Sequence, residues 1–171
     1  DLNGKEYGEE NRRRLGKVEQ ERPDCILTGG DMLTRTQPET DRTALALMRR
    51  LASAAPVYAA NGNHEQKMKE NCRQYGDRYE RYRHALLEAG IRVLENETCL
   101  FQKEGFQAAI TGLELPLSCY SHLGREELPV EEIEERVGER SGDTYRLLMA
   151  HNPASTDGYW DWGVDIVQTV H

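Results

Sequence analysis

Long hydrophobic segments, paired cysteines and an excess of basic residues are all missing from this sequence. No apolar run approaches the length needed to cross a bilayer, and no signal peptide is visible. The four cysteines form no CxxC pair, which argues against a zinc knuckle or a disulfide framework. The net charge is -8 and the pI about 5.2. An acidic chain is a poor general nucleic-acid binder, because phosphate backbones attract stripes of Lys and Arg.

A glycine-rich phosphate loop is also missing. Neither GxGxxG nor GxxxxGK[ST] occurs in the chain. Both motifs wrap backbone N–H groups around phosphates. Their absence weighs against a nucleotide-binding α/β domain that binds its ligand without hydrolysing it.

The chain has 171 residues, of which 37% are hydrophobic and 30% charged. The apolar residues are clustered rather than diluted, so the sequence is that of a folded protein with a core. No linker is long enough to separate two domains, and we therefore expect a single domain over 1–171.

Strand and helix patterns alternate along the chain, which indicates an α/β fold with helices on the outer faces of the sheets. A hairpin pattern lies in the middle of the chain. Three segments, 32–40, 66–74 and 113–128, are expected to be loops. The expected helices cover 9–20, 75–89, 130–137 and 155–162, and a further helix is capped by Asp41 or Thr43 and stopped by Pro56. The expected strands cover 25–28, 57–60, 91–94, 98–101, 106–111, 145–150 and 164–167.

Four of the short apolar runs lead into residues that bind metal ions. The run from Cys25 leads to Asp31, and the run from Val57 leads to Asn63 and His64. Two further runs lead to His151 and His171. Ligands in such sheets bind beyond the carboxyl ends of the strands. A mixture of oxygen and nitrogen donors at one edge suits divalent transition metals.

Two divalent ions a few ångströms apart can clamp a phosphate for in-line displacement. Asp31 follows two glycines, which allow a tight turn, and it is our choice for the carboxylate that bridges the ions. Asn63 offers a neutral carbonyl oxygen. His151 and His171 offer imidazole nitrogen to one ion. His64 is better placed to face the substrate, where it can protonate a leaving alkoxide.

These motifs resemble the calcineurin-like metallophosphoesterase superfamily, and more narrowly its bacterial branch of small phosphodiesterases, some of them membrane-anchored. The resemblance covers nearly the whole chain and keeps the order of the motifs. The most specific part is Gly62-Asn63-His64-Glu65. The other matching parts are Asp1-Leu2-Asn3, Lys5-Glu6-Tyr7-Gly8, Pro23-Asp24, Gly30-Asp31, His151 and His171.

The resemblance implies a layered αββα sandwich, here truncated at both ends, without its first strand and its C-terminal strands. It also implies hydrolysis of phosphate esters, with a metal-bound hydroxide attacking phosphorus in line. The dinuclear centre would hold Mn, Fe, Zn or similar ions. The resemblance assigns Asp1 and Asn3 to the first ion, Asp31 to both ions, Asn63, His151 and His171 to the second ion, and His64 to acid catalysis.

Two departures from the family pattern fall on the first metal site. The first motif is normally Asp-x-His, and Asn3 occupies the position of the histidine. The last motif is normally Gly-His-x-His, whereas Thr169 and Val170 precede His171. Asparagine oxygen is a weaker ligand than imidazole. We therefore predict a tightly held second ion and a weak or partly empty first site.

The function predicted on these grounds is that of a metal-dependent phosphodiesterase acting on a phosphorylated small molecule or a lipid-type substrate, not on nucleic acid. The alternative is a degenerate relative that binds at most one metal and acts as a scaffold without turnover. Relatives in this branch often carry an N-terminal membrane segment. We therefore expect the chain to be soluble as given and membrane-anchored in a longer form.

Several aromatic and cysteine side chains are expected to belong to the core rather than to the site. Helical spacing indicates packing for Tyr75, Tyr79 and Tyr82. Trp160 and Trp162 are expected to cover the core, and Cys25 and Cys99 to be small buried residues. His84 and His122 are expected on the surface, in a helix and in a loop.

Overall fold

The computed structural model describes residues 11–120, 127–140 and 142–170. The chain divides into two compact units, Asp1–Val93 and Leu94–His171. Each unit has its own sheet and its own hydrophobic core. The two are described in turn.

The first unit is built on a three-stranded parallel sheet in the order β1-β2-β3. Its strands are β1 (Ile26–Thr28), β2 (Val57–Ala59) and β3 (Arg92–Val93). Thr28 pairs with Ala59 in the register of β1 and β2, so these two strands end level with each other. The three strands lie where the sequence predicts them, and each is shorter by one or two residues.

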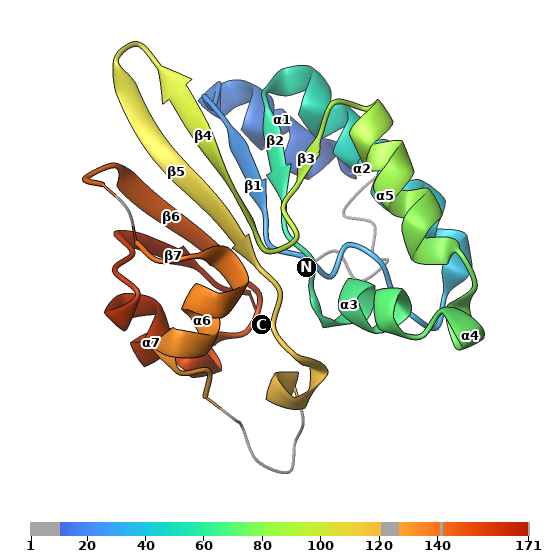
Figure 1. Cartoon of the computed structure of the whole chain (residues 1–171). Coiled ribbons are helices and arrows are strands. Elements are labelled where there is room, and N and C mark those ends of the chain that lie inside the picture. The colour runs from blue at the N-terminus through green and yellow to red at the C-terminus, as the bar shows by residue number, and fades with distance from the viewer. Residues whose placement is uncertain (1–10, 121–126, 141, 171) are drawn as a thin grey trace. The chain divides into compact units, whose positions relative to one another are not determined.

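Helices α2 (Asp41–Ala54) and α5 (Arg78–Glu88) pack together beside this sheet (Figure 1). The buried face of α2 consists of Ala44, Leu47, Met48 and Leu51. These residues form one apolar stripe along the helix, and Leu45 beside it is only partly buried. The other helices of the unit are α1 (Arg12–Glu21), α3 (Asn63–Glu70), α4 (Cys72–Tyr75) and the short 3-10 helix Pro38–Thr40.

The prediction of a loop over 66–74 is wrong, because α3 and α4 cover most of this segment. The segment is polar, and Met68 is the one apolar side chain that α3 buries. A single apolar residue produces no helical period, which explains why the pattern failed here.

The second unit contains a mixed four-stranded sheet in the order β4-β5-β6-β7. Strands β4 (Glu97–Lys103) and β5 (Phe106–Leu113) form the predicted antiparallel hairpin. Glu104 and Gly105 at its tip both have positive φ, 50° and 86°, as a two-residue hairpin turn requires. Strands β6 (Tyr145–Ala150) and β7 (Ile166–Gln168) continue the sheet in parallel with β5.

Helices α6 (Val130–Val137) and α7 (Thr156–Asp161) cover one face of this second sheet (Figure 1). A 3-10 turn, Pro153–Ser155, precedes α7. Segment 113–128 is not simply a surface loop. It contains the 3-10 turn Leu117–Tyr120, and it contributes Leu113, Leu115, Cys119 and Leu128 to the core.

Several predictions for single side chains can now be judged. Tyr79 and Tyr82 are buried in the first core, with Tyr75 partly buried against it, and His84 lies on the surface. Trp162 is 3% exposed, but Trp160 is 51% exposed, so the prediction for Trp160 is wrong. Cys25 and Cys99 are only partly buried, and His122 lies outside the described residues. Within the described segments, no helix combines the length and the apolar character that a membrane span needs.

Candidate metal centre

Two loops leave the sheet of the first unit at the same edge. The first follows β1 and carries Asp31, and the second follows β2 and leads into α3, whose first two residues are Asn63 and His64. The backbone N–H of Ala60 donates to the carbonyl of Thr28 at 2.9 Å, so pairing of the two strands extends to the start of the second loop. This is the carboxyl end of a parallel sheet, where such sheets bind their ligands.

The two loops meet backbone to backbone, and both need glycine at the contact. A Cβ atom on Gly30 would lie 2.1 Å from the nitrogen of Gly62. A Cβ atom on Gly62 would lie 2.3 Å from Oδ1 of Asp31. Gly30 also has a φ of 93°, which L-residues rarely adopt. The glycines therefore allow the approach that brings Asp31 next to the second loop.

Asp31 is buried, and its carboxylate contacts the start of α3. Its Oδ1 accepts a hydrogen bond from the backbone N–H of His64 at 3.0 Å. Its backbone has a φ of 50°, in the left-handed region. A non-glycine residue is uncommon there, and such positions cluster at binding and catalytic sites.

The side-chain amide of Asn63 faces the Asp31 carboxylate. With its nitrogen turned towards Asp31, the amide donates to Oδ2 at 2.8 Å and to Oδ1 at 3.2 Å. With its oxygen turned towards Asp31, acceptors would face one another and repel unless a cation lay close to both. The same pair can therefore close on itself or bind a metal, and its oxygen donors suit a divalent ion.

The imidazole of His64 is held by the first loop. Its Nδ1 lies 3.2 Å from the carbonyl oxygen of Leu33. A carbonyl only accepts, so Nδ1 carries the hydrogen in this contact. The contact thus leaves Nε2 as the ring nitrogen that is not engaged by the Leu33 carbonyl.

Glu65 lies beneath the same junction and is 1% exposed. Its carboxylate accepts from the backbone N–H groups of Asp31, Leu33 and Gly62. Burial raises the pKa of Glu65, the neighbouring charge of Asp31 raises it further, and the backbone hydrogen bonds oppose the rise. The sequence contains a signal for this residue, since Glu at the third position of a helix is typical of a capping box.

Helix α5 supports both loops from consecutive residues. Arg78 donates to the carbonyl of Thr34 at 2.7 Å, on the first loop. Tyr79 accepts on its hydroxyl from the side-chain amide of Asn61 at 2.6 Å, on the second loop. Sequence reasoning assigned neither Arg78 nor Asn61 a role, because both contacts depend on how α5 packs.

In the second unit, His151 directly follows β6 and is buried. Its carbonyl accepts from the N–H of Val170 at 3.1 Å, and its ring lies 6.1 Å from that of Tyr120. The next residue, Asn152, donates to the carbonyl of Cys119 at 2.7 Å and accepts on its own carbonyl from the Tyr159 hydroxyl at 2.8 Å. The turn that carries His151 is therefore held by hydrogen bonds to Cys119 and to Tyr159.

The structure thus brings Asp31, Asn63 and His64 together in the first unit, and it describes His151 in the second unit. The predicted ligands Asp1, Asn3 and His171 lie outside the described residues. Within the described residues alone, no three Asp, Glu, His or Cys side chains are grouped closely enough to hold a metal ion. The assignment of all these residues to a metal centre stays a prediction.

Comparisons with known proteins bear on the family and on the fold. A profile of the calcineurin-like phosphoesterase family matches residues 6–170. Among solved structures, the chain is similar to a phosphopantetheinyl hydrolase from Mycobacterium tuberculosis, with a TM-score of 0.50 and 20% identity. The match covers 90% of this chain and 66% of that chain, so this chain spans just under two thirds of that protein's length. The comparison with curated proteins found no match.

At 20% identity the solved structure is informative about the fold alone. It agrees with the metallophosphoesterase-type α/β fold expected from the sequence. The family profile covers nearly all of the chain, including the segments that carry Asp31, Asn63, His64 and His151. Members of this family are phosphoric ester hydrolases that generally use divalent metals. The chain therefore belongs to the calcineurin-like phosphoesterase family.

Proposed function

We propose that this chain hydrolyses phosphate esters, diesters in preference to monoesters, with the help of two divalent ions. The observation that carries the proposal is the junction of two loops at the end of β1 and β2. There the Asn63 amide faces the Asp31 carboxylate, and the His64 N–H binds the same carboxylate. We further propose that 1–171 act together as one metallophosphoesterase domain.

The proposed ligands follow from the chemistry of their donor atoms. Asp31, Asn63, His151 and His171 would hold the tighter ion, and Asp31, Asp1 and Asn3 the weaker ion. Such ions supply positive charge for a phosphoryl group and lower the pKa of a coordinated water. Manganese, iron or zinc would fit this set of oxygen and nitrogen donors.

The proposed role of His64 is to hold a proton for the leaving oxygen. Its Nδ1 contact with the carbonyl of Leu33 keeps the ring oriented. When the ring is protonated on both nitrogens, Nε2 can donate its proton to the alkoxide as the bond to phosphorus breaks, which leaves a neutral ring with its hydrogen on Nδ1. This assignment separates metal binding by Asp31 and Asn63 from proton transfer by His64.

The proposed substrate is a phosphorylated small molecule or a lipid-type phosphodiester. The similar solved structure is named a phosphopantetheinyl hydrolase, which is a hydrolase of a phosphorylated small molecule. The net charge of -8 is unfavourable for a nucleic-acid substrate.

The test measures the number of bound metal ions and the rate of hydrolysis on the same samples. The protein is loaded with Mn²⁺ or with Zn²⁺ and freed of excess ion, and hydrolysis of bis-p-nitrophenyl phosphate is compared with that of p-nitrophenyl phosphate. We expect faster diester hydrolysis, which a chelator abolishes. Asp31→Asn should abolish it too. Asp77→Asn, at an exposed position on the edge of α5, should leave it unchanged. Turnover that survives both the chelator and Asp31→Asn would overturn the proposal.

The second candidate function is a scaffold that binds one ion and has no turnover. The observation in its favour is the sequence itself, which has Asn3 in place of histidine in the first family motif and Thr169-Val170, with no glycine, before His171 in the last. One bound ion with no hydrolysis of either substrate would favour it. Two bound ions with turnover would exclude it.

A further inference from the structure

A buried carboxylate joins the two loops of the candidate metal centre from below. Oε2 of Glu65 accepts from the backbone N–H of Asp31 at 2.8 Å and from that of Gly62 at 3.0 Å. Its Oε1 accepts from the N–H of Leu33 at 2.8 Å. One side chain in the first turn of α3 therefore fixes the backbone on both sides of the junction.

These three contacts require a carboxylate rather than any polar side chain. An ionised carboxylate only accepts, and it can take all three N–H groups at once. A glutamine of the same shape would turn an NH₂ group towards at least one of the N–H donors. A donor would then face a donor in a site that excludes water, and the two would repel.

The hydrogen bond from the Asp31 N–H to Glu65 holds a backbone segment in an unfavourable conformation. Asp31 has a φ of 50°, a conformation that side chains other than glycine adopt only when their surroundings impose it. Its N–H is held by Glu65, and its carboxylate is held by the His64 N–H and faces the Asn63 amide. The direction of the Asp31 carboxylate therefore depends on the position of Glu65.

We propose that Glu65 is a positioning residue, which presents Asp31 and Asn63 to a divalent ion by binding the N–H groups of Asp31 and Gly62. The proposal rests on the proposed function, since it takes Asp31 and Asn63 to be metal ligands. It adds that the affinity for the ion depends on a carboxylate that does not touch the ion. Residues that orient metal ligands in this way commonly change affinity by 10- to 100-fold when replaced.

The first experiment compares Glu65→Gln with the wild-type chain in the absence of metal. Amide chemical shifts and hydrogen exchange of Asp31, Leu33 and Gly62 report on the three bonds directly. We expect all three shifts to move and exchange to become at least tenfold faster in Glu65→Gln. Glu70→Gln, on the exposed side of the same helix, should change none of them.

The second experiment measures Mn²⁺ binding by calorimetry on the same proteins. We expect Glu65→Gln to bind Mn²⁺ about 10- to 100-fold more weakly than the wild-type chain, and Glu70→Gln to bind it equally well. Leu51→Ala removes a buried side chain of α2 that lies in the core. This variant should lower the melting temperature but keep the affinity, which separates positioning from general stability.

Glu65→Asp covers the case in which Glu65→Gln does not fold. It keeps the charge but shortens the side chain by one methylene. We expect the Asp31 amide to lose its protection from hydrogen exchange and the variant to bind Mn²⁺ at least fivefold more weakly.

Two results would overturn the inference. One is wild-type Mn²⁺ affinity together with an Asp31 amide that has lost its protection, in either variant. The other is unchanged amide protection with unchanged affinity. A wild-type chain that binds no Mn²⁺ would refute the proposed function itself, and Glu65 would then only brace the two loops.

Discussion

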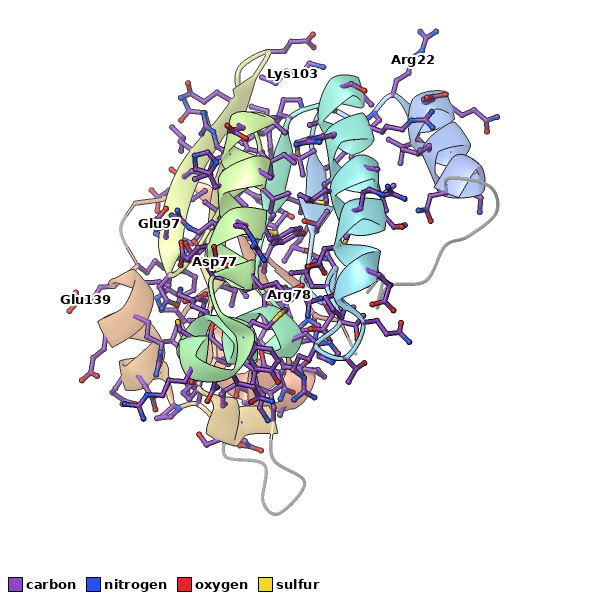
Figure 2. The ribbon with its side chains drawn as sticks, turned by 90° about the vertical axis from the view of Figure 1, so that its right-hand side faces the viewer. Arg22, Asp77, Arg78, Glu97, Lys103 and Glu139 are labelled. Atoms are coloured by element: carbon purple, nitrogen blue, oxygen red, sulfur yellow. The ribbon has the colours of Figure 1, made fainter. Side chains whose placement is uncertain are left out.

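Arg78 and Asp41 form a two-pronged ion pair between α5 and the start of α2. Nε of Arg78 lies 2.6 Å from Oδ2 of Asp41, and Nη2 lies 2.5 Å from Oδ1. The same guanidinium donates to the carbonyls of Thr34 and Arg35. Arg78 lies at the first turn of α5 (Figure 2). A single side chain thus connects two helices to the loop that follows Asp31.

We predict that Arg78→Lys destabilises the chain by about 1–3 kcal/mol, because lysine cannot replace the planar fork and leaves buried acceptors without donors. Urea unfolding would measure the loss. Arg81→Lys is the matched control, because Arg81 and its partner Asp77 are 71% and 69% exposed. An exposed pair contributes little, so this control should stay within about 0.5 kcal/mol of the wild type. Equal losses in the two variants would contradict the prediction.

Gly62→Ala tests the close approach of the two loops. Its Cβ would lie 2.3 Å from the Asp31 side chain and 2.4 Å from the Asp31 backbone nitrogen, so the loops must move apart. We expect a loss of about 1–3 kcal/mol in unfolding free energy, as for an overpacked core, together with weaker Mn²⁺ binding. Thermal unfolding without Mn²⁺ would measure the loss of stability, and the stabilisation on adding Mn²⁺ would measure the binding.

Gly16→Ala is the control for that substitution. Gly16 lies inside α1, and a Cβ there has open space around it. Alanine should stabilise this helix by about 0.5–1 kcal/mol, because glycine has more backbone freedom to lose on folding. A destabilised Gly16→Ala, or a Gly62→Ala as stable as the wild type, would refute the packing argument.

His64→Asn tests the proposed separation of proton transfer from metal binding. We expect Mn²⁺ affinity close to the wild type and a loss of about 10²- to 10⁴-fold in hydrolysis of an alkyl diester. The loss should be much smaller with p-nitrophenyl diesters, because p-nitrophenolate leaves without a proton. His84→Asn, on the exposed side of α5, should change neither rate. A loss that is independent of the leaving group would rule out the acid role.

Two buried tyrosines predict a loss of stability at alkaline pH. The pKa of Tyr82 is raised well above its ordinary value of 10.0, mainly by burial and further by the carboxylates of Glu65 and Asp41. Burial also raises the pKa of Tyr159. The folded state keeps both phenols neutral, whereas the unfolded chain ionises near pH 10. Their contribution is therefore complete below pH 10 and declines above it, by up to about 1.4 kcal/mol per pH unit for each group.

Urea unfolding between pH 8 and pH 11, with tyrosinate absorbance recorded in parallel, would check this dependence. Tyr82→Phe should remove about half of the decline above pH 10, because phenylalanine has no proton to lose. A decline of unchanged steepness in Tyr82→Phe would show that other groups cause it.

The strands and the hairpin could be predicted because their signals are local. Val57 to Ala59 is an apolar run stopped by Pro56 and Gly62, and Gly105 marks the tip of the hairpin. Helix α3 has no comparable apolar pattern, since its one buried apolar side chain is Met68, and its local signal is the capping-box position of Glu65 alone. Its start is instead fixed by Glu65, whose hydrogen-bond donors at Asp31 and Leu33 are more than 30 residues away.

The two tryptophans of the second unit also show that sequence alone could not predict which side chain is buried. Trp160 and Trp162 are two residues apart and of identical type, so composition could not separate them. Trp162 is buried with its Nε1 donating to the carbonyl of Gly138 at 2.9 Å, whereas Trp160 faces solvent. The direction in which α7 packs decides between them.

By itself the sequence determined the α/β class and the family. It also predicted Asp31, Asn63, His64 and His151 as site residues, because each follows an apolar strand in a recognisable motif. Only the tertiary structure decided how Asp31 and Asn63 face each other and which groups hold them there. The supports, Glu65, Arg78 and Tyr79, act through hydrogen bonds to residues distant in the chain. Such bonds leave no periodic trace in a sequence, because they depend on how close the backbone segments come once the core has packed.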